Sequence, residues 1–394
     1  MRISQLIHPF PARMASDIAL STCETLPPGA VVLDPMAGSG TVLRIAAESG
    51  LRGIGLDIDP LAVLISRVWT TALEAEAIIG AAGEVLKEAR ALPVDVPLPW
   101  IDEDPDTCRY VEYWYAQQQR DDLRRLAFVL HTRQGAIANA LRVAVSRLII
   151  TKERGASLAA DVSHSRPHKV REANDYPVFD QFLRAARLIS TRLQGEAIRG
   201  NVDVNHGDSR RMGGIAAGSV DAVITSPPYL NAIDYLRGHR LSLVWFGHRV
   251  GRVRTLRSDS IGAERAPDAG ANLELARRLT AQVDPELRLP SSHRRMVDRY
   301  ALDMHDFLRE VARTLRPRAR AVLVVGDSCL RRVFIENSGI VRRAAESVGL
   351  ELVEERTREI PEDRRYLPPP SKENVAALQY RMRTEVVQTF RKAA

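Results

Sequence analysis

The first part of the chain alternates short apolar runs with amphipathic stretches. Residues 31–33 form a buried-strand pattern, a glycine-rich turn follows them, and residues 42–49 have the periodicity of a helix. Residues 51–56 alternate glycine with apolar side chains and predict a second strand, after which residues 61–70 predict a second helix. This order of strand, helix, strand and helix is typical of a parallel sheet covered by helices.

Helical periodicity dominates the middle of the chain, between residues 73 and 199. The link at residues 92–105 is rich in proline and aspartate, and the link at residues 151–176 has the polar composition of a loop. The four predicted helices span residues 71–91, 110–131, 136–150 and 178–194. We interpret this part of the chain as an insertion into the α/β pattern.

The α/β pattern resumes after the insertion. The predicted strands span residues 202–204, 222–225 and 321–325, the predicted helices span residues 303–315 and 341–348, and residues 350–357 fit an antiparallel late strand. The sequence therefore predicts an α/β fold with a mainly parallel, doubly wound sheet. Its two halves, residues 1–70 and 201–394, are separated by a large helical insertion at residues 71–200.

Composition excludes several classes of protein. The 394 residues are 45% hydrophobic and 27% charged, as in an ordinary globular protein. No apolar stretch is long enough to cross a bilayer, and the first residues lack the apolar core of a signal peptide. The three cysteines are far apart and no two histidines have metal-binding spacing, which argues against a disulfide framework or a metal site. We expect a cytoplasmic protein with no membrane contact.

The charge of the chain favours a polyanionic partner. The net charge is +7, and only five of the 56 basic residues are lysines. Arginine suits bidentate contacts with phosphate, but a GC-rich genome explains the arginine bias about equally well. Composition alone therefore does not establish the partner.

A candidate ligand-binding turn follows the first predicted strand, in the segment Asp-Pro-Met-Ala-Gly-Ser-Gly-Thr, although some turns of this kind only pack a helix on a sheet. Gly38 and Gly40 allow the backbone to approach a ligand closely, and the helix behind them offers unpaired N–H groups. The third glycine of the dinucleotide fingerprint and the lysine of a phosphate-binding loop are both missing. Asp57 ends the next strand, where a carboxylate can accept both hydroxyls of a ribose.

A second turn, Ser226-Pro227-Pro228-Tyr229, ends an apolar strand. The amine of a nucleobase is a poor nucleophile because its lone pair is conjugated with the ring. The Ser226 hydroxyl and the Pro227 carbonyl can accept its two N–H bonds and draw the pair out of conjugation, while Tyr229 offers a ring for stacking a flipped base. Direct transfer of a methyl group to the amine needs no covalent nucleophile. Methylation at carbon 5 of cytosine would need an attacking cysteine near a proline, and none of the three cysteines lies in a turn of that kind.

Together the two turns resemble those of the class I S-adenosylmethionine-dependent DNA amino-methyltransferases. Ser226 at the first position resembles the N4-cytosine type, with its Thr-Ser-Pro-Pro-Tyr motif. The resemblance implies a Rossmann-like fold, S-adenosylmethionine as cofactor, and N4-methylcytosine formed in double-stranded DNA with the target base flipped. It also implies a site-specific modification or phage-defence role, with cognate restriction or defence proteins as partners. The insertion at residues 71–200 is a candidate for target recognition.

The resemblance also implies a set of cofactor ligands. The segment from His8 to Arg13 resembles the N-terminal cofactor motif of the family. We expect Asp59 to cap a helix, whereas a turn role and an adenine contact are equally plausible for Asp208. The implied ligands are Phe10, Arg13, Asp34, Pro35, Ala37, Gly38, Gly40, Thr41, Asp57, Ile58, Asp208 and Ser209.

Nucleic-acid contacts are expected just after the Ser-Pro-Pro-Tyr turn. The stretch from Arg237 to Arg257 holds six arginines and no acidic residue. A second basic stretch lies in the polar link at residues 151–171. The aromatic residues at positions 110–115 are more typical of a core than of a stacking surface. The residues expected to contact phosphates are Arg237, Arg240, Arg252, Arg254, Arg166 and Lys169.

Other functions remain open from the sequence. An RNA methyltransferase acting on the N2 amine of guanine, or an N6-adenine DNA methyltransferase, would use a similar turn. A non-catalytic nucleic-acid-binding subunit would keep the fold without turnover, but the intact Ser226, Pro227 and Tyr229 favour catalysis. A nicotinamide oxidoreductase fits least, because nothing in the turn would orient a hydride acceptor.

Overall fold

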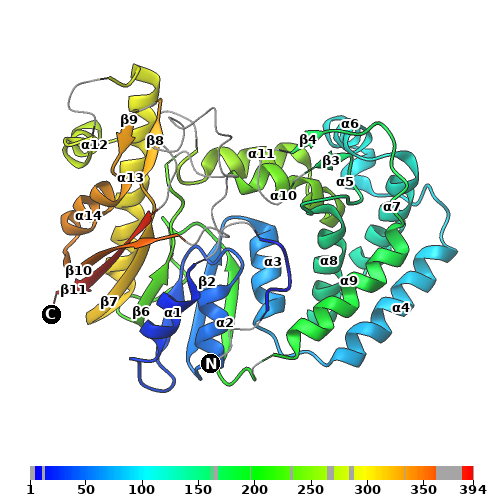
Figure 1. Cartoon of the computed structure of the whole chain (residues 1–394), viewed down its shortest axis with the longest axis horizontal. Helices are drawn as coiled ribbons and strands as arrows, with labels where there is room; N and C mark the ends of the chain where they lie inside the picture. The colour runs from blue at the N-terminus through cyan, green and yellow to red at the C-terminus, as the bar shows by residue number, and fades with distance from the viewer. Residues whose placement is uncertain are drawn as a thin grey trace.

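The protein combines a seven-stranded sheet with a bundle of helices beside it (Figure 1). The computed structural model describes residues 5–10, 14–160, 162, 167–195, 197–230, 234–263, 270–283, 288–331, 333–360 and 384–393. In Figure 1 the sheet occupies the left half and the bundle the right half, and α10 (Tyr235–Leu243) and α11 (Val250–Asp259) lie above and between them. No helix in these ranges is long and apolar enough to cross a bilayer.

The strand order identifies the fold. The sheet has the order β10-β11-β7-β6-β1-β2-β5, with β11 antiparallel to both neighbours and all other pairs parallel. This is the order of a Rossmann-like class I methyltransferase fold, so the predicted fold class is confirmed. The strands are β1 (Val31–Asp34), β2 (Arg52–Asp57), β5 (Val202–His206), β6 (Val220–Thr225), β7 (Leu315–Val325), β10 (Leu350–Glu359) and β11 (Thr384–Lys392).

Both faces of the sheet are covered, because successive strand residues point to opposite sides. Val322 and Val324 of β7 share a core cluster with α1 (Ser16–Cys23) and α2 (Thr41–Glu48). Leu323 and Val325 share a cluster with the helices of the other face. Those helices are α13 (Ser291–Thr314) and α14 (Asn337–Ser347), and α12 (Leu273–Thr280) packs beside them.

The glycines of β2 reflect close helix packing. A β-carbon at Gly55 would lie 2.4 Å from a methyl carbon of Leu43 in α2, and one at Gly53 would lie 3.3 Å from the other methyl. Any larger residue at Gly55 would push α2 off the sheet. After β2 the chain turns into α3 (Pro60–Trp69), as predicted.

The predicted insertion is helical, but one predicted helix is wrong. Instead of a single helix over residues 110–131, the chain breaks at Tyr115 and Ala116, which are both extended. The buried Tyr115 hydroxyl donates to the Leu241 carbonyl at 2.6 Å, so a tertiary contact and not a local signal sets the break. The helices are α4 (Ala75–Ala91), α5 (Pro99–Asp102), α6 (Pro105–Trp114), α7 (Gln117–His131), α8 (Ala136–Ile149) and α9 (Val178–Leu193).

The link at residues 151–176, which we predicted to be a polar loop, is partly core in the ranges that the structure describes. Ala156, Ala159 and Val162 are buried in the apolar cluster of the helical region. The Leu158 amide donates to the Trp114 carbonyl at 2.8 Å, and β3 (Ala159–Ala160) pairs with β4 (His168–Lys169). The loop prediction is therefore wrong for this part of the link.

The residues after the Ser-Pro-Pro-Tyr turn pack on the helical region. Leu241 of α10 and Val250 of α11 belong to the same apolar cluster as Leu61 of α3 and Leu141 of α8. Trp245, in the short helix η1 (Val244–Phe246), joins this cluster. The helical region, α3, α10 and α11 thus share one apolar cluster, and α3 also packs on β2 and β5 of the sheet. Beyond β7, β8 (Ser328–Leu330) and β9 (Val333–Ile335) form a small hairpin.

Candidate active site

Two turns lie next to each other at the carboxyl edge of the sheet. Because β1 and β6 are parallel neighbours, the residues that follow them emerge side by side. The Thr225 hydroxyl at the end of β6 donates to the Asp34 carboxylate at the end of β1, at 2.7 Å. Burial raises the pKa of Asp34 to about 7, although hydrogen bonds from Thr225 and the Met36 amide oppose the rise. This bond joins the two turns into one candidate site.

The glycine-rich turn, residues 35–40, is held by its backbone. Gly38 and Gly40 have φ angles of +51° and +85°, a left-handed conformation that favours glycine. The Ser66 hydroxyl of α3 donates to the Gly38 carbonyl at 2.9 Å, and a β-carbon at Gly40 would lie 2.8 Å from that hydroxyl. The predicted ligands in this turn and at the start of α2 are Pro35, Ala37, Gly38, Gly40 and Thr41.

Asp57 supports the same turn from the end of β2. One carboxylate oxygen accepts the Gly38 amide at 2.8 Å and the other accepts the Asp59 amide at 2.9 Å. Burial, followed by the neighbouring Asp59 carboxylate, raises the pKa of Asp57 to about 6. Each oxygen keeps a lone pair for a further donor, such as a ribose hydroxyl. The adjacent Ile58 is partly buried, and its carbonyl accepts a hydrogen bond from His206 at 3.0 Å.

Asp59 caps α3, as predicted, and has a second role. One oxygen accepts the Leu61 amide at 2.9 Å, and the other contacts Nδ1 of His239 in α10. His239 is only 2% exposed, and its Nε2 has no hydrogen-bond partner among the described residues. The pair connects α3, whose Ser66 bonds the glycine-rich turn, with α10, which follows the Ser-Pro-Pro-Tyr turn. The sequence gives no signal for this pair, because 180 positions separate the two residues.

The N-terminal segment lies over the glycine-rich turn. The Phe10 ring would be 3.4 Å from a β-carbon at Gly38, and its centroid lies 5.2 Å from the His239 ring and 5.6 Å from the Tyr235 ring. Phe10 is therefore placed where a cofactor bound at this turn would be covered. The other predicted ligand of this segment, Arg13, lies outside the described residues.

Asp208 is engaged in a charged cluster after β5. Its carboxylate pairs with Arg210 at 2.7 Å and also accepts the Arg210 amide at 2.9 Å, which is the turn role. Burial alone would raise the pKa of Asp208, but the hydrogen bonds from Arg210 outweigh burial and hold it below its usual range. Arg210 also pairs with Asp303 of α13 at 2.6 Å. An adenine contact by Asp208 stays a prediction, and the neighbouring Ser209 is buried.

Ser226 has its hydrogen directed away from the site. Its hydroxyl donates to the Val324 carbonyl of β7 at 3.1 Å and lies 3.4 Å from the Tyr229 hydroxyl. A serine has one hydrogen and two lone pairs. When that hydrogen is held by Val324, the oxygen can interact with a ligand only as an acceptor.

The rest of the turn is packed closely. Pro227 is buried, while Pro228 and Tyr229 are partly buried. Burial, with a smaller contribution from the Glu385 carboxylate, raises the pKa of Tyr229. A β-carbon at Gly262 would lie 3.2 Å from the Tyr229 carbonyl, so the segment after α11 passes over this turn.

The expected phosphate-binding arginines are mostly paired. Arg237 pairs with Asp234 at 3.4 Å and Arg254 pairs with Asp106 at 3.5 Å, while the Arg240 guanidinium lies 4.7 Å from the Tyr110 ring centroid. Arg254 thus meets a carboxylate from a distant helix, whereas the carboxylate partner of Arg237 lies only three positions before it in the chain.

The remaining predicted phosphate contacts differ from one another in whether they have a carboxylate partner. Arg252 is exposed and has no carboxylate partner in the part of the chain that the structure describes. Lys169 pairs with Glu172 at 2.8 Å and lies 5.0 Å from the Tyr113 ring centroid. Arg166 lies outside the described residues.

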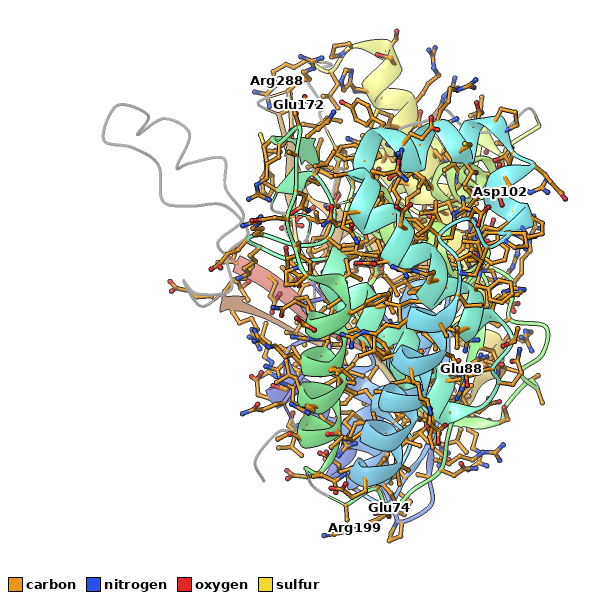
Figure 2. All side chains as sticks on the ribbon, turned by 90° about the vertical axis from the view of Figure 1, so that its right-hand side faces the viewer. Glu74, Glu88, Asp102, Glu172, Arg199 and Arg288 are labelled. Atoms are coloured by element: carbon orange, nitrogen blue, oxygen red, sulfur yellow. The ribbon has the colours of Figure 1, made fainter. Side chains whose placement is uncertain are left out.

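The outer face of the helical region carries mixed charge. In Figure 2 the exposed carboxylates Glu74, Glu88 and Asp102 are distributed along that face. Glu88 pairs with Arg133 at 2.5 Å and Asp102 pairs with Arg124 at 2.7 Å. This face therefore does not carry charge of a single sign. Among the described residues, no group of three or more metal-ligating side chains could hold a metal ion.

Comparisons with known proteins give structural neighbours only. No family model matches the chain, and no curated protein matches it. A SAM-dependent methyltransferase structure from Methanosarcina mazei shares 9% identity and a TM-score of 0.33, covering 95% of this chain and 97% of that chain. An rRNA methyltransferase from Streptomyces viridochromogenes shares 11% identity and a TM-score of 0.31, covering 96% of this chain and 86% of that chain. A candidate DNA modification methylase from Thermus thermophilus shares 16% identity and a TM-score of 0.24, covering 48% of this chain and 51% of that chain.

Proposed function

We propose that this chain is an S-adenosylmethionine-dependent methyltransferase that modifies an exocyclic amine of double-stranded DNA and forms N4-methylcytosine. The observation that carries the proposal is the hydrogen bond from Ser226 to the Val324 carbonyl, at 3.1 Å. It leaves the Ser226 oxygen as an acceptor at the edge of the sheet where the glycine-rich turn also lies. An acceptor at this place suits a substrate that presents N–H groups.

The glycine-rich turn has the chemistry that the cofactor requires. The left-handed backbone at Gly38 and Gly40 keeps side chains out of the turn, and the Asp57 carboxylate retains lone pairs for ribose hydroxyls. Ile58 and Asp208 are the proposed neighbours of the adenine, and Phe10 is the proposed cover. When bound, S-adenosylmethionine supplies an electrophilic methyl group.

The residues of the Ser-Pro-Pro-Tyr turn orient and activate the amine in this proposal. The Ser226 oxygen and the Pro227 carbonyl accept its two hydrogens, which concentrates the nitrogen lone pair toward the methyl donor. The Thr225–Asp34 bond fixes the distance between the two turns, so positioning supplies much of the rate. Tyr229 contributes a partly buried ring beside the base.

Double-stranded DNA is the proposed partner, contacted from the α11 side. The exposed Arg252 is the strongest candidate for a phosphate contact, because the neighbouring arginines already have carboxylate or ring partners. Salt bridges of exposed arginines are weak, so phosphates can replace those carboxylates at little cost.

The proposal is tested by methyl transfer. The full chain is incubated with labelled S-adenosylmethionine and either duplex genomic DNA or total RNA, and the label in each polymer is counted. We expect label in DNA with wild-type protein and a loss of about a hundredfold with Ser226→Ala. Label in RNA alone would overturn the DNA assignment while leaving the reaction type intact, and no label in either polymer would overturn the catalytic role.

A further inference from the structure

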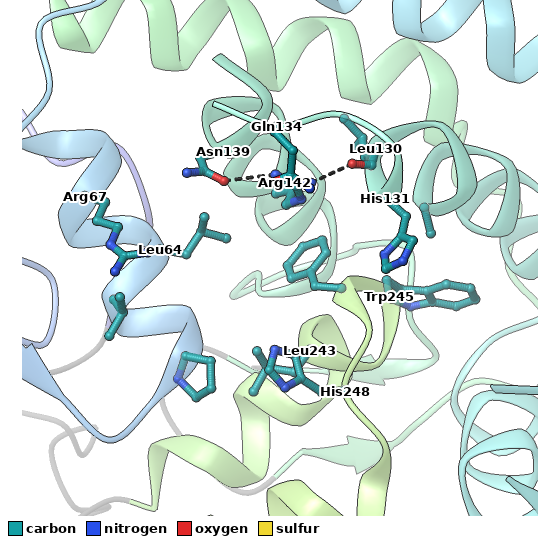
Figure 3. A pocket seen from close by; sticks show the side chains of 14 residues that line it. Leu64, Arg67, Leu130, His131, Gln134, Asn139, Arg142, Leu243, Trp245 and His248 are labelled. Atoms are coloured by element: carbon teal, nitrogen blue, oxygen red, sulfur yellow. Dashed lines mark hydrogen bonds between the residues drawn. The ribbon is translucent and has the colours of Figure 1, made fainter. Parts of the chain in front are cut away.

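A cavity separate from the candidate active site lies between α3 and the helical region (Figure 3). Its volume is about 380 Å³, within the range of small-molecule sites. Leu64 and Arg67 of α3 form one wall, α7 and α8 form a second, and the segment from Leu243 to His248 forms a third. Ser66, which bonds the glycine-rich turn, is two positions from Leu64, about 200° around the helix. The cavity and the turn thus use different faces of α3.

Two arginines give the cavity walls positive charge, and no carboxylate lines the cavity. Two histidines also line it. Arg67 donates to the Val204 carbonyl at 2.6 Å and to the Asn205 side chain at 3.3 Å. Arg142 donates at 2.6 Å to each of two main-chain carbonyls at the end of α7 and at 2.9 Å to the Asn139 amide oxygen. All these partners are neutral, so the two guanidinium charges favour an anionic ligand.

The remaining groups suit a flat, polar ring. Trp245, Phe246 and Leu64 present apolar surface to the cavity. The Asn139 oxygen is held by Arg142, so its amide nitrogen is left to donate. Burial, with the nearby Arg252, lowers the pKa of His248, so a neutral ring with one donor and one acceptor is expected there. In Figure 3 the labelled Arg67, Arg142 and His248 surround the same space from three different elements.

We propose that this cavity binds one phosphorylated nucleotide, with the phosphate near Arg67 and Arg142 and the base against Leu64 and Trp245. The chemistry is the same for a free mononucleotide and for a single extrahelical nucleotide of a DNA strand. The site does not depend on the proposed methyl transfer, since none of the residues that line the cavity belongs to either turn.

Calorimetry on the full chain tests the proposal. The titrants are AMP, GMP, CMP and UMP, the matching nucleosides and inorganic phosphate, all with saturating S-adenosylhomocysteine so that adenine cannot report on the cofactor turn. We expect at least one mononucleotide to bind about tenfold more tightly than its nucleoside. Arg67→Gln should weaken that binding about tenfold, and Leu64→Trp, which fills the cavity, should abolish it.

The matched control is Arg133→Gln. Arg133 lies close to Arg142 in sequence, but its side chain pairs with Glu84 and Glu88 and does not line the cavity. We expect Arg133→Gln to bind nucleotide like wild type. Affinity unchanged in both Arg67→Gln and Leu64→Trp, or no binding of any mononucleotide at millimolar concentration, would overturn the proposal. Competition by a single-stranded oligonucleotide would assign the ligand to DNA, and its failure to compete would assign the ligand to a free nucleotide.

Discussion

The glycine-rich turn and the Ser-Pro-Pro-Tyr turn lie at the same edge of the sheet but are held by different contacts. In the first turn the backbone of the turn itself makes the hydrogen bonds: the Gly38 amide donates to Asp57, and the Gly38 carbonyl accepts from Ser66. Ser66 also approaches Gly40 closely. The second is held mainly by side chains, Thr225 on Asp34 and Ser226 on Val324.

The difference predicts different roles for the two turns. A turn held by its backbone fixes the shape of a site and tolerates few residues, because any added side chain collides or strains the chain. A turn held by hydroxyl groups keeps spare acceptors that can act on a substrate. Substitutions in the first turn should therefore affect folding and cofactor binding, and substitutions in the second should affect turnover.

The largest expected effect is the loss of stability in Gly40→Ala. The new β-carbon would lie 2.8 Å from the Ser66 hydroxyl at a φ of +85°. Overpacking and backbone strain together should cost about 3 kcal/mol of unfolding free energy, measured by urea denaturation. Gly29→Ala is the control, because Gly29 has φ +76° and nothing within 4 Å, so strain alone should cost about 1 kcal/mol. Equal losses in the two variants would show that Ser66 does not restrict the turn.

Ser226→Ala should lower kcat about a hundredfold and leave cofactor affinity unchanged. The reason is that the variant removes an acceptor for the amine but no contact of the glycine-rich turn. Ser219→Ala at the opposite end of β6 is the matched control, since among the described residues its hydroxyl bonds only the Ala216 carbonyl. Steady-state kinetics and calorimetric titration of the cofactor separate the two effects. A parallel loss of cofactor affinity would mean that Ser226 supports the fold of the site.

Cofactor affinity should fall at low pH because of Asp57. Burial raises its pKa to about 6, and only the ionised carboxylate can accept two ribose hydroxyls. Affinity should be constant above pH 6 and fall about tenfold for each unit below it. Asp34→Asn is the control because the pKa of Asp34 is about 7. A midpoint near 7 that disappears in Asp34→Asn would assign the titration to Asp34 instead.

The smallest expected effect concerns DNA binding. Arg252→Gln should reduce the salt dependence of DNA affinity by about one phosphate contact, measured by fluorescence anisotropy across salt concentrations. Arg254→Gln should have a smaller effect, since Arg254 is already paired with Asp106 at 3.5 Å. Equal slopes for wild type and Arg252→Gln would place the DNA elsewhere.

Much of the fold was predictable from local patterns. The first two strand-helix units, the strand before Ser226 and the apolar part of β7 all follow from buried runs and turn residues. β11 was not predicted, because its place between β7 and β10 depends on antiparallel pairing with residues far away in the chain. The start of α13 was also missed, since it begins at Ser291, ahead of the predicted start at residue 303.

The motifs of the site were predictable from the sequence, but the pairs between distant charged residues were not. Gly38, Asp57 and Ser226 could be singled out because turn and strand-end chemistry is local. The Asp59–His239 pair and the Asp106–Arg254 pair could not, because each joins residues more than 100 positions apart. Such pairs depend on the packing of the helical region against the sheet, which sequence periodicity does not specify.

The identity of the methylated nucleoside tests the central proposal most directly. The protein is incubated with labelled S-adenosylmethionine and duplex DNA, the DNA is digested to nucleosides, and the labelled product is identified by mass and chromatographic mobility. We expect N4-methylcytosine with wild type and about a hundredfold less of it with Ser226→Ala. Labelled 5-methylcytosine would contradict the account, because methylation at that carbon requires a covalent nucleophile that the Ser-Pro-Pro-Tyr turn does not provide.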